Sequence, residues 1–434
     1  MKTIYCIQPF SASGHHDAYA DMYCKLLIEL GYRVILIADG NRVNIAQELH
    51  AYGKKGLFYF FYRQSETVHE ISDTPAKNCS KLRRIARICK IYLFNTMRYA
   101  FARIKIYIPP RKRRHIQDTL LTQGSIEEIR ITTGYSPNHV FILYFDYYLH
   151  GEQQSLQNVP TPWTGLLFNA KGIKRGDYYL YKALSLPLCS GIAMFDPRYE
   201  NIYKKTFPEK NFAIFPDVQN SDLTEYEPDW CGAIKDKAAG RTVVTLPGSL
   251  ATRKGVITLL KVAYSCTNAP LFFVFCGPLS WDAFADSPAA DRELLRAGID
   301  SPPENCYFYL QYIENESERN HLFLISDIIF AVYEDFDLSS GTVGKAAVFG
   351  KPVLVQKGGL MERFVSKGPF GEAVQSGDVQ AIIAALQHIR SGRQPYHFAQ
   401  YAAEISLDRL RECLGSFMRS LEQYKDPYDV CPRP

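Results

Sequence analysis

Short apolar runs and longer amphipathic segments alternate along the chain, starting at its N-terminus. Residues 3–8 form an apolar run, a polar loop follows, and residues 18–30 carry apolar positions at helical spacing before Gly31. Residues 33–38 are β-branched and apolar, which is typical of a buried parallel strand. This strand–helix–strand order predicts a Rossmann-like first domain. Further strands are predicted at residues 57–62, 140–144, 165–168 and 191–195.

A second series of the same kind begins near residue 240. Strands are predicted at residues 242–246, 271–276, 307–312, 328–332 and 352–356, and helices at 256–264, 317–325 and 343–349. Asp378 is expected to cap a helix that runs to Gly392, because a short acidic side chain accepts hydrogen bonds from free backbone N–H groups. The pattern therefore predicts a second doubly wound α/β domain, followed by a final amphipathic helix at residues 405–424.

The length of the chain agrees with two domains. It has 434 residues, of which 47% are apolar and 22% charged. Such a composition indicates globular folding, and the length suggests two domains of roughly 200 residues each. Polar turn residues replace the periodic pattern at 215–222, so we expect an N-terminal domain at 1–215, a C-terminal domain at 222–395, and a last segment at 396–434 that returns to the first domain.

The eleven cysteines are scattered, and no CxxC pair or Cys/His cluster has the spacing of metal ligands. We interpret them as reduced, mostly buried thiols of a cytoplasmic protein without a metal site. Only Lys2 precedes the first apolar run, and 18 apolar residues never follow one another. Neither a signal peptide nor a transmembrane helix is expected.

Positive charge is concentrated in one segment. Residues 77–114 hold 13 Lys and Arg and no acidic residue, leaving 37 basic residues against 45 acidic ones elsewhere. On a helical wheel, residues 81–100 separate an apolar face from a basic one, a pattern typical of helices that lie on membranes. A peripheral contact with an anionic membrane surface is the favoured interpretation. A solvated helix that packs on its own domain is the alternative, and nucleic acid is not the expected partner.

Candidate anion-binding residues follow two predicted strands of the second domain. Gly248 lies in the loop after residues 242–246, and Arg253 and Lys254 stand at the start of the next helix. Cations beside a helix N-terminus suit a diphosphate, although a solvated pair of cations gives the same pattern. After residues 328–332, an acidic loop leads to Ser339, Ser340 and Gly341. Their N–H groups could receive phosphate, with Ser339 as the expected helix cap; an ordinary strand–loop–helix unit is the alternative.

These segments together resemble the retaining, GT4-like branch of the GT-B glycosyltransferases. The resemblance rests on Lys254-Gly255, the loop from Asp337 to Gly341, Gly350-Lys-Pro-Val353 and Gly358-Gly-Leu-Met-Glu362, and it covers roughly residues 240–375. It implies two Rossmann-like domains that face a cleft. It also implies a nucleoside diphosphate sugar as donor, and neither a further cofactor nor a bound metal.

The resemblance also implies roles for individual residues. Arg253 and Lys254 would neutralise the leaving diphosphate, helped by the N–H groups of 339–341. Asp337 would touch the donor sugar, and Glu362 closes the Gly-Gly turn. The sequence departs from the family at two donor positions, where Lys345 and Ser249 stand in place of a glutamate that holds the ribose and of a phosphate-binding arginine.

The acceptor side is less clearly marked. His15 and His16 follow the first predicted strand and could position or deprotonate a hydroxyl group, but a polar loop with a helix cap at Asp17 fits equally well. Asp146 follows the predicted strand 140–145 and is a candidate base or a simple turn residue. Asn169 stands where the family usually has a histidine.

The sequence thus predicts a metal-independent transferase that moves a sugar from a nucleotide-sugar donor to a hydroxyl acceptor, either a glycan or a lipid-linked precursor of a surface polysaccharide. Two alternatives stay open. A sugar-nucleotide epimerase or hydrolase of the same fold would need no large acceptor. A non-catalytic protein that binds nucleotide sugars or membranes would explain Lys345 and Asn169.

Overall fold

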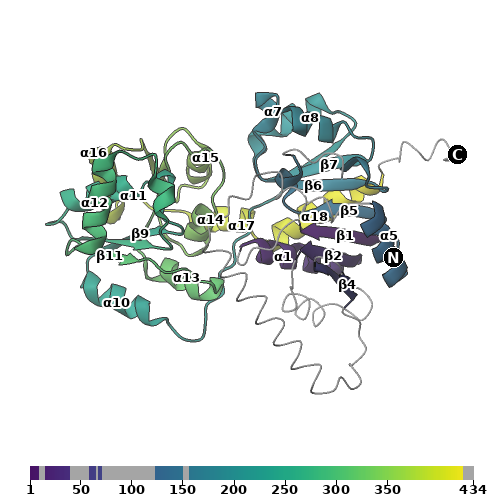
Figure 1. The fold of residues 1–434 in the computed structure, drawn as a ribbon. Helices are drawn as coiled ribbons and strands as arrows, with labels where there is room; N and C mark the ends of the chain where they lie inside the picture. Colours follow the sequence, from purple (N-terminus) through teal and green to yellow (C-terminus); the bar gives the residue numbers. More distant parts are fainter. Residues whose placement is uncertain (9–14, 40–57, 65–66, 71–122, 150–155, 424–434) are drawn as a thin grey trace, which may run out of the picture. The chain divides into compact units, whose positions relative to one another are not determined.

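The computed structural model describes residues 1–8, 15–39, 58–64, 67–70, 123–149 and 156–423. The chain divides into two compact units (Figure 1). The first consists of Met1–Ala193, Ile202–Asn211 and Leu421–Pro434, and the second of Met194–Asn201 and Phe212–Ser420. The chain forms two separate sheets, and the expectation of two Rossmann-like folds is confirmed.

The first sheet has eight strands in the order β4-β3-β2-β1-β5-β6-β7-β8. Their bounds are Thr67–Glu70 (β4), Phe58–Gln64 (β3), Arg33–Asp39 (β2), Thr3–Gln8 (β1), His139–Ile142 (β5), Trp163–Leu167 (β6), Cys189–Met194 (β7) and Asn211–Ile214 (β8). Strand β1 pairs in parallel with β2 and β5, whereas β4 pairs antiparallel with β3. The order of the strands therefore reverses between β1 and β5, which defines a topological switch point.

The opening of this unit follows the predicted strand–helix–strand pattern. Every residue of β1 is buried, as expected for a central parallel strand with both faces covered. Helix α1 (His15–Glu29) connects β1 to β2 and ends before Gly31, whose φ of +88° is a backbone conformation that favours glycine. The other helices of this part of the chain are α5 (Gln123–Thr133), α7 (Gly172–Arg175), α8 (Tyr178–Leu184) and α9 (Glu200–Thr206).

The second sheet has six strands in the order β11-β10-β9-β12-β13-β14, and each pairing between them is parallel. Their bounds are Cys306–Tyr309 (β11), Leu271–Cys276 (β10), Thr242–Pro247 (β9), Ile328–Ala331 (β12), Val353–Gln356 (β13) and Gly371–Val374 (β14). Numbered within the unit, this order is 3-2-1-4-5-6, that of a Rossmann dinucleotide-binding domain. It places the switch point between β9 and β12.

Helices cover both faces of the second sheet (Figure 1). Successive residues of β10 show this, because Phe273 and Phe275 pack into one core with α11, whereas Phe272 and Val274 pack into another with α10. The helices of this later part of the chain are α10 (Asp229–Ala238), α11 (Val256–Ser265), α12 (Ala289–Asp300), α13 (Glu316–Ile325), α14 (Gly341–Val348), α15 (Leu360–Lys367), α16 (Val379–Arg390), α17 (Phe398–Glu404) and α18 (Leu407–Glu422), of which α18 ends beside the first sheet. Asp378 caps α16 as predicted, and its carboxylate accepts from Ala381 N at 2.9 Å.

Several boundaries differ from the sequence prediction. The strand expected at 307–312 ends at Tyr309, and the strand expected at 140–144 ends at Ile142. The final helix expected at 405–424 is present as α18, Leu407–Glu422, and a separate short helix that was not predicted, α17, precedes it. The last residue of α18, Glu422, pairs with Lys2 at 3.0 Å, so the end of this helix contacts the start of the first sheet.

The whole basic segment 77–114, including the predicted membrane helix, lies outside the described residues. Within the part of the chain that the structure describes, no helix has the length and apolar composition needed to cross a membrane.

Candidate functional site

The switch point of the second sheet brings three loops together. The loops after β9 and β12 leave neighbouring parallel strands at the same edge of the sheet, and the N–H of Gly248 donates to the last residue of β10, Cys276, at 2.8 Å. Ligands of open α/β sheets bind in the crevice at such a point. The predicted donor residues Gly248, Arg253 and Lys254 all lie in the loop after β9.

Two glycines shape this loop. Gly248 has φ +89°, and a Cβ atom there would lie 3.7 Å from the Lys254 ammonium, so the backbone of Gly248 is close to that charge. Gly255 has φ +73°, and a Cβ atom there would come within 2.5 Å of the carbonyl oxygen of Val332. A side chain at Gly255 would therefore push the start of α11 away from the segment after β12.

Lys254 is nearly buried, with 9% of its surface exposed. Its ammonium donates to the hydroxyl of Tyr333 at 2.6 Å and lies 4.2 Å from the centre of that ring. Among the described residues, no Asp or Glu pairs with it. A buried charge is normally paired, so this ammonium lacks the anion that its burial calls for. The alternative of a solvated cation does not hold for Lys254.

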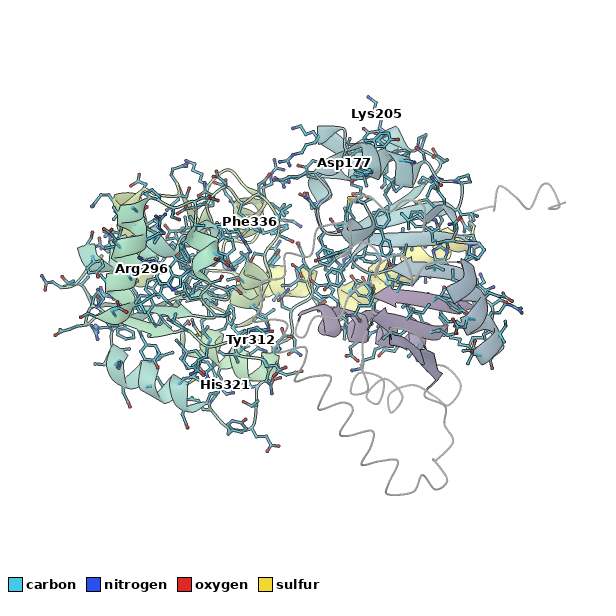
Figure 2. All side chains as sticks on the ribbon, viewed as in Figure 1. Asp177, Lys205, Arg296, Tyr312, His321 and Phe336 are labelled. Carbon is cyan, nitrogen blue, oxygen red and sulfur yellow. The ribbon has the colours of Figure 1, made fainter. Side chains whose placement is uncertain are left out.

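Arg253 lies on a different side of the loop. It is exposed, and its guanidinium carbon lies 5.3 Å from the centre of the Phe336 ring, which Figure 2 labels. Its carbonyl oxygen accepts from the N–H of Glu334 at 2.8 Å, which ties the loop after β9 to the loop after β12. The two adjacent cations thus have different surroundings, and Lys254 alone contacts Tyr333.

The N-terminus of α14 forms the other side of this region. The helix begins at Gly341, and its N-cap is Ser340 instead of the expected Ser339, because the Ser340 hydroxyl oxygen accepts from Thr342 N at 3.4 Å. The hydroxyl of Tyr333 donates to Thr342 Oγ1 at 3.0 Å. Lys254, Tyr333 and Thr342 therefore form one hydrogen-bonded chain from the loop after β9 to the start of α14.

The electrostatics of Tyr333 reflect this chain. Burial raises the pKa of a phenol, but the attraction of the Lys254 ammonium and its hydrogen bond act in the opposite direction. Side-chain hydrogen bonding with Ser340 and Thr342 also lowers the pKa of Tyr333. The net effect is that the pKa of Tyr333 is lowered from its ordinary value.

Asp337, the predicted contact to the donor sugar, is already engaged. One carboxylate oxygen accepts from Arg198 Nη1 at 2.6 Å and from the N–H of Leu360 at 3.0 Å, so Asp337 also caps α15. Arg198 is held from its other side by Asp196, at 2.7 Å. Hydrogen bonding to Asp196, and then to Asp337, raises the pKa of Arg198 and keeps it charged.

Glu362 lies in the first turn of α15, where its carboxylate accepts from the N–H of Gly358 at 2.6 Å. Asp337 and Glu362 thus both bind the segment at the start of α15. An acid near a helix N-terminus is favoured by the dipole of the helix, which accounts for two carboxylates at this position.

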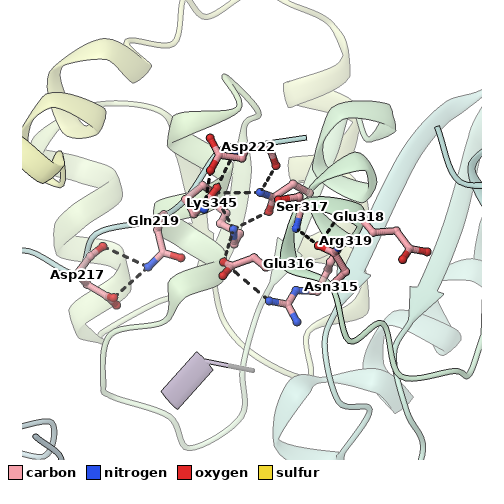
Figure 3. A network of polar contacts seen from close by, with 11 residues as sticks. Asp217, Gln219, Asp222, Asn315, Glu316, Ser317, Glu318, Arg319 and Lys345 are labelled. Carbon is pink, nitrogen blue, oxygen red and sulfur yellow. Dashed lines mark hydrogen bonds and ion pairs between the residues drawn. The ribbon is translucent and has the colours of Figure 1, made fainter. Parts of the chain in front are cut away.

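Lys345 has a full set of partners (Figure 3). Its side chain is 5% exposed, and its ammonium contacts Glu316 Oε1 at 2.8 Å, Asn320 Oδ1 at 2.6 Å and the carbonyl oxygen of Asn220 at 2.8 Å. An ammonium has three N–H donors, and these three contacts use all of them. Lys345 therefore joins α13 and α14 to the segment at 220.

The acceptor-side candidates are placed as follows. His15 and His16 begin α1, and their side chains lie outside the described residues. Asp146 lies in a short 3₁₀ turn after β5, Phe145–Tyr148, where its carboxylate accepts from the N–H groups of Phe168 at 2.7 Å and Asn169 at 2.8 Å. It thereby holds the loop after β6, beside the switch point of the first sheet.

Sequence reasoning missed Tyr333 and Arg198 as members of this site. Tyr333 continues the apolar run 328–332, and Arg198 lies in a different strand–loop unit, 139 residues before Asp337. No group of three or more potential metal ligands occurs among the described side chains.

Comparison with solved structures identifies the fold. The sucrose-phosphate synthase of Thermosynechococcus elongatus superposes with a TM-score of 0.61 over 98% of this chain and 100% of that one, at 14% identity. The HepE protein of Anabaena, solved in complex with UDP, gives a TM-score of 0.59 over 97% and 100% of the chains, at 12% identity. This is the GT-B fold.

Other GT-B structures of similar score differ in activity. A protein of Listeria monocytogenes described as a putative UDP-N-acetylglucosamine 2-epimerase gives a TM-score of 0.57 at 9% identity, over 98% of this chain and 99% of that one. No model of a protein family matches the sequence, and neither does any curated protein. At these identities the structural similarity establishes the fold alone, and the reaction has to be inferred from the residues of the candidate site.

Proposed function

We propose that the protein is a glycosyltransferase that binds a nucleoside diphosphate sugar at the switch point of its second sheet and transfers the sugar to a hydroxyl group. The observation that carries this proposal is Lys254, a nearly buried ammonium without a described acidic partner. A diphosphate is the anion that would complete it, because it brings negative charge and several acceptor oxygens to the ammonium and to the start of α14.

The chemistry follows from charge. As the bond from the sugar to the diphosphate breaks, negative charge grows on the leaving oxygen. Lys254 and the N–H groups at Ser340 and Gly341 would stabilise that charge, and such stabilisation by fixed groups is a large catalytic term. Arg253, which is exposed, would add attraction for the incoming donor. The proposal includes no metal ion, since these groups supply the positive charge.

The donor sugar and the acceptor complete the proposal. Asp337 would contact the sugar, with Arg198 holding its carboxylate in place. His15, His16 and Asp146 are the candidates on the acceptor side. The complexes of HepE with UDP support a nucleotide-sugar donor in this fold. We propose a glycan or lipid-linked acceptor, as in the biosynthesis of surface polysaccharides, and a mechanism like that of the GT4 branch.

The basic segment 77–114 extends the proposal to the membrane. Its 13 cations and lack of acidic residues would attract an anionic lipid surface at about 1 kcal/mol for each cation close to it. Such attraction weakens as salt rises, because exposed charges are screened. Sedimentation with anionic vesicles should therefore fall with salt concentration, and equal binding to neutral vesicles would contradict this part of the proposal.

A sugar-nucleotide epimerase is the second candidate, favoured by the likeness to the Listeria protein. The two functions differ in what they consume. An epimerase converts an isolated sugar nucleotide and releases no nucleoside diphosphate when an acceptor is added. A transferase needs the acceptor and releases the nucleoside diphosphate with each turnover.

The test of the proposed site is the variant Lys254→Met, which keeps the volume of the side chain and removes its charge. A charge-assisted contact is worth about 1.5–3 kcal/mol, so binding of UDP should weaken roughly 10- to 150-fold by calorimetry. The melting temperature without ligand should stay level or rise, because a buried charge without a described anionic partner has been removed.

Lys261→Met is the matched control. Lys261 lies in the neighbouring helix α11, is exposed and pairs with Asp291 at 2.7 Å, so its loss should leave binding unchanged. If Lys254→Met binds UDP, GDP and ADP as tightly as the parent protein does, the diphosphate site is not at Lys254 and the proposal fails.

A further inference from the structure

Tyr333 combines a buried ring with a hydroxyl group that has polar partners. It lies two residues beyond the end of β12 and is 1% exposed. Its ring packs in the core around α14 and meets Phe336 edge-on, with 5.4 Å between the ring centres. Packing of the ring requires no hydroxyl group, and a buried hydroxyl is costly unless it is hydrogen-bonded. Packing of the ring therefore does not explain the hydroxyl oxygen, and its hydrogen-bond partners indicate its role.

The phenol oxygen links two parts of the site. It accepts from Lys254 Nζ at 2.6 Å, and its own hydrogen is donated to Thr342 Oγ1 at 3.0 Å. A phenol can donate once and accept, so this direction of the chain satisfies it. One of the three N–H donors of Lys254 is used in this way, which leaves two for an anion.

We propose that Tyr333 is a positioning residue of the diphosphate site, whose hydroxyl holds the Lys254 ammonium toward the N-terminus of α14 in both the empty and the occupied site. The inference rests on the proposed function, because it assigns Lys254 a diphosphate ligand. It adds a residue that acts through Lys254 and touches no substrate.

Holding the ammonium in place matters because a lysine side chain is long. A free lysine has about 2 kcal/mol of rotamer entropy to lose when it binds a phosphate. A lysine that is already fixed by Tyr333 has lost that freedom before the ligand arrives, so more of the charge attraction appears as affinity. Phenylalanine at 333 would keep the ring and release the ammonium.

The same pair predicts a characteristic dependence on pH. The pKa of Tyr333 is lowered, so its phenol ionises at a lower pH than an exposed tyrosine does. The phenolate would neutralise Lys254 and repel a diphosphate. The other charged groups nearby are turned elsewhere or exposed: Glu334 accepts from Thr258 at 2.9 Å, Asp335 is exposed, and Arg253 lies over Phe336.

The experiment measures binding of inorganic pyrophosphate, which needs no knowledge of the base, and of UDP by calorimetry. The proteins are the parent, Tyr333→Phe, Lys254→Met and the double variant, each at pH 7.5 and near pH 10. Thr342→Val removes the hydroxyl group that accepts the hydrogen bond from Tyr333. It is a second way to disturb the same chain of hydrogen bonds. Tyr396→Phe is the control, because it deletes another tyrosine hydroxyl of the domain, bonded to Glu372 at 3.1 Å.

We expect Tyr333→Phe to weaken binding roughly 3- to 10-fold at pH 7.5, the effect of one hydrogen bond, with a smaller loss in Thr342→Val. Near pH 10 the difference between parent and Tyr333→Phe should shrink or reverse, because the parent alone forms the phenolate. The titration of the ligand is common to both proteins and cancels. In the Lys254→Met background, Tyr333→Phe should have no further effect.

Each other outcome has a defined meaning. If Lys254→Met loses binding but Tyr333→Phe binds like the parent at both pH values, the inference about Tyr333 fails and the proposed function stands. A loss in Tyr333→Phe that is independent of pH, and persists without Lys254, indicates a packing role and also overturns the inference. If Lys254→Met binds like the parent, or the parent binds neither probe, the proposed site itself fails.

Discussion

Replacing Lys345 by methionine should destabilise the second domain, although Lys345 occupies a position where the resembling family contacts its ligand. The ammonium makes three hydrogen bonds, to Glu316, Asn320 and the carbonyl oxygen of Asn220. Asn320 continues the network, since its Nδ2 donates to the carbonyl oxygen of Asp222 at 2.8 Å. Methionine would fill the space and remove the ammonium from these partners, leaving Glu316 with the more distant guanidinium of Arg319 at 3.9 Å (Figure 3).

The magnitude follows from the burial of the network. Removing one partner of a buried ion pair typically costs about 3–5 kcal/mol, because the other charge stays buried. Glu316 is 21% exposed and keeps part of its hydration, so the lower end, about 3 kcal/mol, applies. Burial also lowers the pKa of Lys345, against the attraction of Glu316, which shows that desolvation offsets some of the gain. For a domain of roughly 200 residues the melting temperature should fall by about 6–12 °C.

Urea unfolding followed by tryptophan fluorescence measures the change in free energy. Trp230 is a suitable probe, because its indole N–H lies 3.3 Å from Glu318 on α13, the helix that carries Glu316. Lys367→Met is the matched control: Lys367 pairs with Glu404 at 2.7 Å and its side chain is 62% exposed, so its loss should cost less than about 1 kcal/mol. If Lys345→Met and Lys367→Met are equally stable, the network does not stabilise the domain and the reasoning is wrong.

Two further predictions concern backbone and pH. Gly255→Ala should lower the stability of the second domain by roughly 1–3 kcal/mol in urea unfolding and weaken UDP binding, because its φ is +73° and a Cβ atom would strike the carbonyl of Val332. An unchanged midpoint would argue against this packing. Burial lowers the pKa of His139 to about 3, so the unfolded state binds the proton first as pH falls below about 6.5. The parent should therefore lose about 2 kcal/mol between pH 7.5 and pH 5 relative to His139→Leu, and parallel profiles would refute this assignment.

The central strands of the second domain could be predicted because local composition determines them. Residues 271–276 form a strand with the predicted bounds, since an uninterrupted apolar run before Gly277 fits a strand that is buried on both faces. The edge strand β14 was missed, because Gly371–Val374 is only partly buried and its residues show no such run. The final helix, predicted at 405–424, forms as α18 at Leu407–Glu422, whereas the seven-residue helix α17 before it was not predicted.

Only those features of the candidate site that depend on residues close together in the sequence could be predicted. The position of Lys254 before Gly255 indicated an anion site, but its burial depends on how the loop after β9 packs against the segment after β12. Ser339 and Ser340 are adjacent and chemically alike, so the choice of cap depends on backbone geometry. Arg198 and Asp337 are 139 residues apart, and no periodicity connects them.

Lys254 and Lys345 show how pairing distinguishes a binding residue from a structural one. Both are nearly buried lysines of the second unit, with exposures of 9% and 4%. The Lys345 ammonium contacts a carboxylate and two further oxygen acceptors. Each of its three N–H donors is therefore used, and none is left for a ligand. Lys254 has one neutral phenol and two N–H donors with no described partner. Because both side chains are nearly buried and their partners differ, a ligand that carries negative charge should stabilise the protein through Lys254 and leave the contacts of Lys345 unchanged.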